Sequence, residues 1–211
     1  MDDSSPYLIL ATAYLPPVEY LYYLNKTGNI FIDIYENYIK QTYRNRCYVM
    51  TANGRLCLTV PVIKTFGNHT QIKDIKIDYS QPWQRSHWRA IESAYNSSPF
   101  FIYYRDEIEP IFRKKFLFLI DLNTELLNAL NKLYYINCDI KFTKNYIEHS
   151  EKLKDLKYSI TPKSKHISFS NFPEYNQVFS EKYGFISNLS SIDLLFNSGK
   201  FSKEYLDRIE V

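Results

Sequence analysis

A basic, amide-rich segment between residues 38 and 46 is the first stretch whose residue types could carry chemistry. Its polar members are Lys40, Gln41, Arg44, Asn45 and Arg46. Arginine has a planar fork of donors that matches phosphate or carboxylate. On one strand face, Arg44 and Arg46 would lie roughly 7 Å apart, so together they could hold a diphosphate. The same residues could also form the solvated outer face of an amphipathic hairpin, and the spacing leaves both interpretations open.

His87 is the second candidate, because it shares one face of a predicted helix with Trp83, Ile91 and Tyr95. It therefore faces protein or a pocket, and imidazole is the usual general base near neutral pH. A histidine on an apolar face can equally be a structural residue. A third candidate is the loop from Thr12 to Tyr14, because crevices beyond strand ends are favoured binding positions in mixed sheets.

Signatures of metal and cofactor sites are absent from the sequence. It has no glycine-rich phosphate loop, no G-x-S-x-G or H-E-x-x-H motif, and no metal-ligand spacing among its four histidines. The three cysteines include no C-x-x-C pair, so we expect free thiols and no disulfide. We expect no metal and no cofactor, and we predict that Cys47 is buried and structural.

The basic segment leads into an Asn53-Gly54 hairpin, the strongest short-range signal for a tight two-residue turn. This turn predicts that the pairs are Thr51 with Leu56, Val49 with Leu58, Cys47 with Val60 and Asn45 with Val62. One face of the hairpin is then apolar and directed into the core, with Asn45 needing a specific partner there. Arg44 and Arg46 fall on the other face, and Cys47 and Cys57 lie on opposite faces.

Hydrophobic periodicity places the other elements. We expect strands at 7–11, 29–35, 71–78 and 136–143, and helices at about 17–26, from Pro82, from Pro99 with a kink or break at Pro110, across the leucine stripe 122–133, and from a capping box at Ser190. Residues 144–168 give no clear element. The pattern predicts a single domain of mixed α/β (α+β) class over residues 1–211, with a mostly antiparallel mixed sheet, a central Asn-Gly hairpin and several packed helices.

Composition narrows the class of partner. The net charge of +3, from 26 basic and 23 acidic residues, lacks the basic excess typical of nucleic-acid binders. No apolar run approaches the roughly 18 residues of a membrane span, and the first residues carry no basic signal-peptide region. We therefore expect a cytoplasmic protein with no nucleic-acid partner and no membrane span. Its 20 tyrosines, 14 phenylalanines and 2 tryptophans suggest aromatic-lined surfaces, although a codon bias toward tyrosine would explain them too.

The chain resembles the WbqC-like family of bacterial proteins, first named from an O-antigen polysaccharide gene cluster. Four blocks carry the resemblance: TAYLPPVEY (12–20), YIKQTYRNRCYV with GRLCLTVPV (38–62), IKIDYSQPWQRSHWRAIESAYNSSPFF (75–101) and YNQVFSEKYGFISNLSSIDLLFNSG (175–199). Other members carry Gln-Pro before the first aromatic, where this chain has Thr12-Ala13, so this loop departs from the family pattern. The resemblance puts the basic segment and the His87 stripe in family motifs and implies that they line one pocket.

Membership would imply a role in surface-polysaccharide or nucleotide-sugar biosynthesis. The first hypothesis is a transferase that adds an acyl or aminoacyl group to an amino sugar. Its small anionic substrate would be a sugar nucleotide, with Arg44 and Arg46 on the phosphates, His87 as base, and Trp83, Tyr95 or Tyr14 stacking on a ring. The second is a non-catalytic binding or assembly protein of the same pathway. Nucleic-acid binding through the interleaved basic and aromatic residues is a third, which the balanced charge disfavours.

Overall fold

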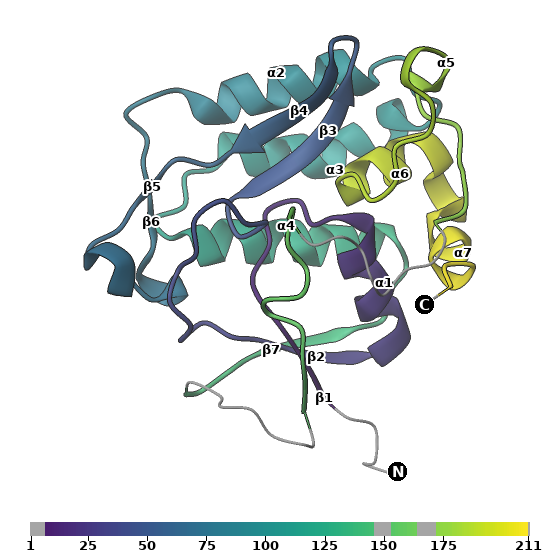
Figure 1. Ribbon diagram of the computed structural model, residues 1–211. Helices are drawn as coiled ribbons and strands as arrows, with labels where there is room; N and C mark the ends of the chain where they lie inside the picture. The colour runs from purple at the N-terminus through teal and green to yellow at the C-terminus, as the bar shows by residue number, and fades with distance from the viewer. Residues whose placement is uncertain (1–6, 146–152, 164–171, 211) are drawn as a thin grey trace.

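The structure is a computed structural model, and it describes residues 7–145, 153–163 and 172–210 (Figure 1). The strands are β1 (Tyr7–Leu10), β2 (Asn29–Ile32), β3 (Arg46–Thr51), β4 (Gly54–Thr59), β5 (Val62–Ile63), β6 (Lys76–Ile77), β7 (Asp139–Phe142) and β8 (Leu153–Asp155). The α-helices are α1 (Val18–Thr27), α2 (Trp83–Tyr95), α3 (Phe101–Arg113), α4 (Leu119–Leu133), α5 (Ser180–Tyr183), α6 (Ser191–Ser198) and α7 (Ser202–Asp207). Short 3-10 turns are η1 (Gly67–His69), η2 (Ile72–Asp74) and η3 (Gly199–Phe201).

The main sheet is parallel, in the order β7-β2-β1-β8, so the expectation of a mostly antiparallel sheet is wrong. The mixed α/β class is confirmed. The physical reason for the direction is the crossover: α1 carries the chain back along the sheet, so that β2 must run the same way as β1. Leu8 pairs with Ile30 and Leu10 with Ile32. The Asn-Gly hairpin is antiparallel, but β3 and β4 form a separate two-stranded sheet.

The register of the hairpin differs from the predicted one by two residues. Thr51 pairs with Gly54, Val49 with Leu56 and Cys47 with Leu58. Asn53 is not among the described residues with positive φ, whereas Gly54 has φ +102°, so the turn is made by residues 52–53 and Gly54 takes the left-handed conformation. A slip of two residues preserves the faces. Cys47 and Val49 are accordingly buried, as expected.

Two predicted helix faces are confirmed, whereas one helix break, one helix start and one strand differ from the prediction. The stripe of α2 and the leucine stripe of α4 are confirmed as buried faces. Of the predicted kink or break at Pro110, the break is wrong, because α3 continues through Pro110 to Arg113. The helix predicted from Pro99 begins at Phe101 instead. The predicted strand 71–78 is also wrong over most of its length, since η2 replaces its first half and only Lys76–Ile77 forms a strand.

The core joins both ends of the chain. The hairpin packs on α2, while α2 contacts α3, α3 contacts α4 and α6, and α1 contacts α6 and α7 (Figure 1). Val18 N–H donates to the carbonyl of Leu189 at 3.1 Å, and Ser190 Oγ donates to the carbonyl of Leu15 at 2.9 Å. Ser190 therefore precedes α6 as predicted, but its hydroxyl bonds to the loop after β1 instead of capping the helix. This packing brings the loop after β1 next to α2.

Candidate functional site

Tyr14 and His87 form a buried pair between the loop after β1 and helix α2. The Tyr14 hydroxyl lies 2.9 Å from His87 Nδ1, and both side chains are almost fully enclosed. Burial lowers the pKa of His87 to about 4, although the backbone of Thr59 opposes the shift. The imidazole is therefore neutral at pH 7 and can accept a proton, but burial disfavours the charged form. The two predicted site residues are brought together here, in a setting closed to bulk water.

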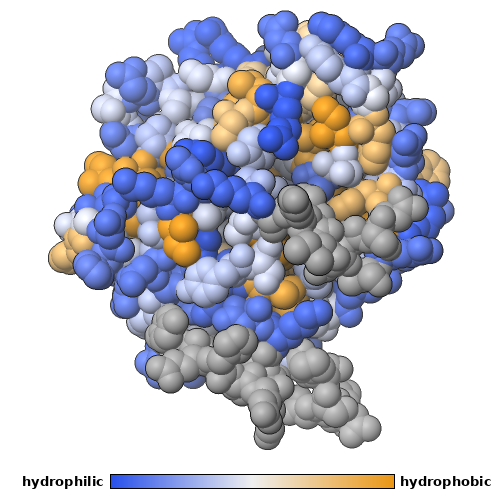
Figure 2. Space-filling model, viewed as in Figure 1, coloured by the Kyte–Doolittle hydropathy of each residue, from blue (hydrophilic) through white to orange (hydrophobic). Residues whose placement is uncertain are grey.

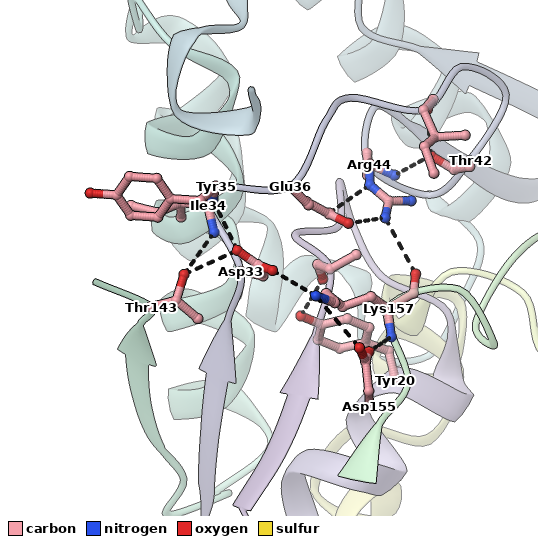
Figure 3. Close-up of polar contacts among 12 residues, drawn as sticks. Tyr20, Asp33, Ile34, Tyr35, Glu36, Thr42, Arg44, Thr143, Asp155 and Lys157 are labelled. Atoms are coloured by element: carbon pink, nitrogen blue, oxygen red, sulfur yellow. Dashed lines mark hydrogen bonds and ion pairs between the residues drawn. The ribbon is translucent and has the colours of Figure 1, made fainter. Parts of the chain in front are cut away.

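Arg44 is also buried, and its guanidinium is already occupied. Its Nε and Nη2 donate to the two carboxylate oxygens of Glu36 at 2.8 and 2.6 Å, and Nη2 also reaches the carbonyl of Lys157 at 3.3 Å (Figure 3). Burial raises the pKa of Glu36, and the Arg44 guanidinium opposes that rise. Because the bidentate fork is taken by Glu36, a phosphate could bind Arg44 only by displacing this carboxylate.

A second buried ion pair lies beside the first at the carboxyl ends of the parallel strands. Lys157, which follows β8, donates to Asp33 after β2 at 2.6 Å and lies 3.5 Å from Asp155 (Figure 3). The hydroxyl of Thr143, after β7, donates to Asp33 at 3.1 Å. The structure thus adds three charged residues that the sequence analysis missed: Asp33, Glu36 and Lys157. Glu36 directly follows the predicted strand 29–35 and Asp33 lies within it, which was a usable signal, but Lys157 falls in the segment without a clear pattern.

The carboxyl edge of the sheet is closed in this state. A cavity of about 10 Å³ remains between Thr12, Tyr43, Arg44 and Lys157. This volume holds about one water molecule. Buried ion pairs contribute little net stability but are costly to break. The main role of this network is therefore to hold the strand ends in place, not to form a substrate site.

The other residues of the basic segment have different environments. Asn45 has the specific partner expected of a buried amide, because its Nδ2 donates to the carbonyl of Val60 at 2.8 Å. Lys40 and Gln41 are exposed, and Arg46 is half-buried at the start of β3. Gln41 has φ +61°, an uncommon conformation for a residue with a side chain. Lys40, Gln41 and Arg46 therefore remain at least partly accessible, whereas Arg44 and Asn45 do not.

Tyr95 is held by a buried carboxylate in the interior. Its hydroxyl donates to Asp193 at 2.8 Å, and Tyr175 donates to the same carboxylate at 2.6 Å. Tyr95 is 1% exposed, and burial, followed by the charge of Asp193, raises its pKa. A ring in this position cannot stack on a ligand without a rearrangement, so its observed contacts are structural.

A cavity of about 610 Å³ runs along α2 and α3. Trp83, one of the predicted site residues, lies in its wall with Tyr79, Trp88 and Phe112. The rings of Trp83 and His87 are 5.2 Å apart, so the cavity wall backs onto the Tyr14–His87 pair. Small-molecule sites have volumes of roughly 300–1,000 Å³ with mainly apolar walls and a few polar groups. The cavity matches that description.

Cations outnumber carboxylates around this cavity. Its charged lining residues are Arg85, Arg89, Arg113, Lys115, Glu92 and Glu109. Glu109 is shared by Arg105 and Arg113, and Glu92 pairs with Arg105. In the described part of the chain, no carboxylate pairs with Arg85 or Arg89, which are one helical turn apart on α2. The cavity therefore combines aromatic walls with arginines available to an anion, and sequence reasoning missed it because its residues come from separate helices.

The lining of this cavity includes Trp83 but neither His87 nor any residue of the basic segment. Within the described ranges, no group of three or more His, Cys, Asp or Glu side chains could hold a metal ion. Cys47, Cys57 and Cys138 are free thiols. None of the helices in the described residues is long and apolar enough to cross a membrane.

Comparisons with known proteins agree with the resemblance seen in the sequence. The sequence model of the WbqC-like protein family matches residues 12–164. A relative from Mycobacterium tuberculosis, "Uncharacterized protein Rv1507c", is 27% identical over 208 residues, covering 83% of this chain and 88% of its own length. No solved structure matches the chain significantly. The family match spans most of the residues described above, including the basic segment, α2 and α3.

Proposed function

The chain belongs to the WbqC-like protein family, and from this premise we propose that it is a transferase acting on a nucleotide-linked sugar in surface-polysaccharide biosynthesis. The reaction we propose is transfer of an acyl or aminoacyl group to an amino sugar. The observation that carries the proposal is the 610 Å³ cavity beside α2, where aromatic walls and two arginines without carboxylate partners among the described residues lie together.

The chemistry of a nucleotide-linked sugar fits this combination. Its base and sugar rings pack on aromatic surfaces such as Tyr79 and Trp83, whereas its diphosphate carries charge that guanidinium groups bind well. Arg85 and Arg89 follow each other by one turn of α2, which places them on the same side of the helix. Lys115 lies 5.5 Å from the centre of the Tyr79 ring and adds a third cation to the same wall.

Direct binding tests this assignment. Titration calorimetry would measure the affinity of wild type for UDP-, GDP- and dTDP-linked amino sugars. We expect the Arg85→Ala/Arg89→Ala variant to bind at least tenfold more weakly, since each charge-assisted contact contributes about 1.5–3 kcal/mol. Arg55→Ala is the matched control, because Arg55 stacks on Tyr48 at 4.5 Å on the hairpin and is absent from the cavity wall. Equal affinities in wild type and the double variant, or no binding of any sugar nucleotide, would contradict the proposal.

A non-catalytic binding or assembly role in the same pathway is the second candidate. The enclosure of His87 favours it, because the predicted base lies behind Trp83 and a charged imidazole is disfavoured there. A complementation assay separates the two roles. The transferase predicts that His87→Gln fails to restore surface polysaccharide in a strain lacking the gene although the variant folds. Full restoration by His87→Gln, with failure of Arg85→Ala/Arg89→Ala, would favour the binding role.

A further inference from the structure

The charge of the chain is unevenly distributed along the sequence. Residues 37–73 contain no Asp or Glu, and they carry six cations: Lys40, Arg44, Arg46, Arg55, Lys64 and Lys73. Arg44 is neutralised by Glu36, and Lys73 stacks on Tyr35 at 4.2 Å. The overall charge of +3 conceals this local excess of positive charge.

The fold brings two lysines of this stretch together. The N–H of Tyr38 donates to the carbonyl of Thr70 at 2.9 Å, and a bridge between Asn37 and Gln71 fixes the same two segments. The N–H of Phe66 donates to Thr70 Oγ1 at 2.8 Å, so the turn after Lys64 adjoins the segment that contains Lys40. Desolvation, followed by the like charge of Lys40, lowers the pKa of Lys64. The Lys64 ammonium reaches Asn68 Oδ1 at 3.0 Å, which is a neutral acceptor. Two ammonium groups held side by side form a site where an external anion would relieve repulsion.

Large apolar side chains are exposed directly beside these lysines. Ile39 is 39% exposed, Ile63 49% and Phe66 65%. Ile39 precedes Lys40 and Ile63 precedes Lys64, while Phe66 opens the turn that contains Asn68. On the side of the molecule that carries β5 and η1, orange apolar atoms lie among blue hydrophilic ones (Figure 2). We define the basic–apolar surface as Ile39, Lys40, Ile63, Lys64 and Phe66.

We propose that the basic–apolar surface docks the protein on an anionic lipid bilayer. Lysine ammonium groups bind lipid phosphates, and apolar side chains at the same level enter the boundary between headgroups and acyl chains. Each lysine near an anionic membrane strengthens binding by about fivefold, which is the equivalent of about 1 kcal/mol. This surface is separate from the α2–α3 cavity, because none of its residues lines that cavity.

The apolar component distinguishes a bilayer from a nucleic acid. Single-stranded nucleic acids are bound by aromatic side chains that stack on bases along a basic groove. Exposed isoleucines add nothing to phosphate or base recognition, but they gain free energy when they leave water for acyl chains.

Vesicle co-sedimentation tests the proposal with the full chain. We expect binding to vesicles of phosphatidylglycerol and phosphatidylcholine, and at least tenfold weaker binding to phosphatidylcholine alone. Lys40→Gln/Lys64→Gln should weaken binding by about 25-fold, from two factors of about five, and Phe66→Ser should weaken it several-fold. Lys200→Gln/Lys203→Gln is the control with the same change in charge; Lys200 and Lys203 lie at the other end of the chain, in η3 and α7, and this variant should bind as wild type does.

The vesicle and oligonucleotide experiments can each contradict the proposal. Absence of binding to the anionic vesicles, or equal loss in both lysine pairs, would overturn the proposal. So would binding of an oligonucleotide that depends on Lys40 and Lys64 while vesicles do not bind. The result is independent of the proposed function, because Lys40→Gln/Lys64→Gln should retain sugar-nucleotide affinity, whereas Arg85→Ala/Arg89→Ala should retain vesicle binding. Circular dichroism confirms that each variant is folded.

Discussion

At the scale of single residues, the type of a side chain determines which chemistry it can perform, and its surroundings determine whether that chemistry is available to a ligand. Arg44 has the fork that binds phosphate, but Glu36 uses that fork in the interior. His87 has the chemistry of a base, but burial keeps it neutral. Arg85 and Arg89 were not among the candidates from the sequence, yet they line the 610 Å³ cavity beside α2. Because they are accessible, Arg85 and Arg89 are better candidates for binding a ligand than the buried Arg44 and His87.

His87 gives a prediction about pH and stability. Its pKa is about 4 in the folded chain and near 6.5 when exposed, so the unfolded state binds the proton first as pH falls. The contribution of His87 to stability is complete above about pH 6.5 and is lost between about pH 6.5 and 4. Between pH 7 and 5 we expect wild type to lose about 2 kcal/mol more of its unfolding free energy than His87→Gln does.

Urea denaturation at the two pH values measures this difference. His69→Gln, at an exposed position in η1, is the control for replacing a histidine outside the core. Parallel curves for wild type and His87→Gln would show that the imidazole is not protected from protonation by the fold.

At the scale of elements, hydrophobic spacing identified the faces of α2, α4 and the hairpin, since a face follows from local geometry. The sequence analysis missed details of register and helix boundaries that depend on contacts between elements. The register of the hairpin was set by the conformation of Gly54, and the start of α3 shifted from Pro99 to Phe101. Ser98 contributes instead to the end of α2, where its hydroxyl donates to the carbonyl of Tyr95 at 2.7 Å.

The junction between α6 and α3 gives a prediction about packing. Gly199 has φ +55°, and a Cβ at this position would lie 2.6 Å from Cγ of Phe100. Gly67 has a similar φ of +59°, but a Cβ there would meet no atom within 4 Å. We expect Gly67→Ala to cost about 1–2 kcal/mol for the left-handed backbone and Gly199→Ala to cost about 1–3 kcal/mol more, because Phe100 must move.

Chemical denaturation of the two variants measures the difference. Because both glycines pay the same backbone cost, the comparison isolates the steric contact with Phe100. Equal destabilisation of the two variants would show that Phe100 yields freely and that the junction is loosely packed.

At the scale of the whole molecule, distant parts of the chain complete each other. β1 pairs with β2 on one side and with β8, more than 140 residues later, on the other. α1 packs against α6 and α7, which end the chain. The complete four-stranded sheet needs both early and late segments, so we expect the chain to fold cooperatively.

The whole chain should therefore unfold as a single domain. We expect one transition in urea, with the same midpoint for tryptophan fluorescence, which reports on Trp83 and Trp88 in α2, and for far-UV circular dichroism, which reports on all elements. Two separated transitions would mean that α2 with the hairpin, and the parallel sheet with α1, fold as independent units.

The sequence by itself determined the mixed α/β class, the family, the buried stripes and the presence of the hairpin, because each of these depends on residue types or on spacing within one segment. Only the tertiary structure decided the parallel direction of the sheet, the pairing of Arg44 with Glu36, and the cavity beside α2. Each of these depends on segments that lie far apart in the chain, and no local pattern encodes which of them meet. Asp33, Glu36 and Lys157 show the limit most clearly: each reads as an ordinary surface charge until the strand ends bring them together.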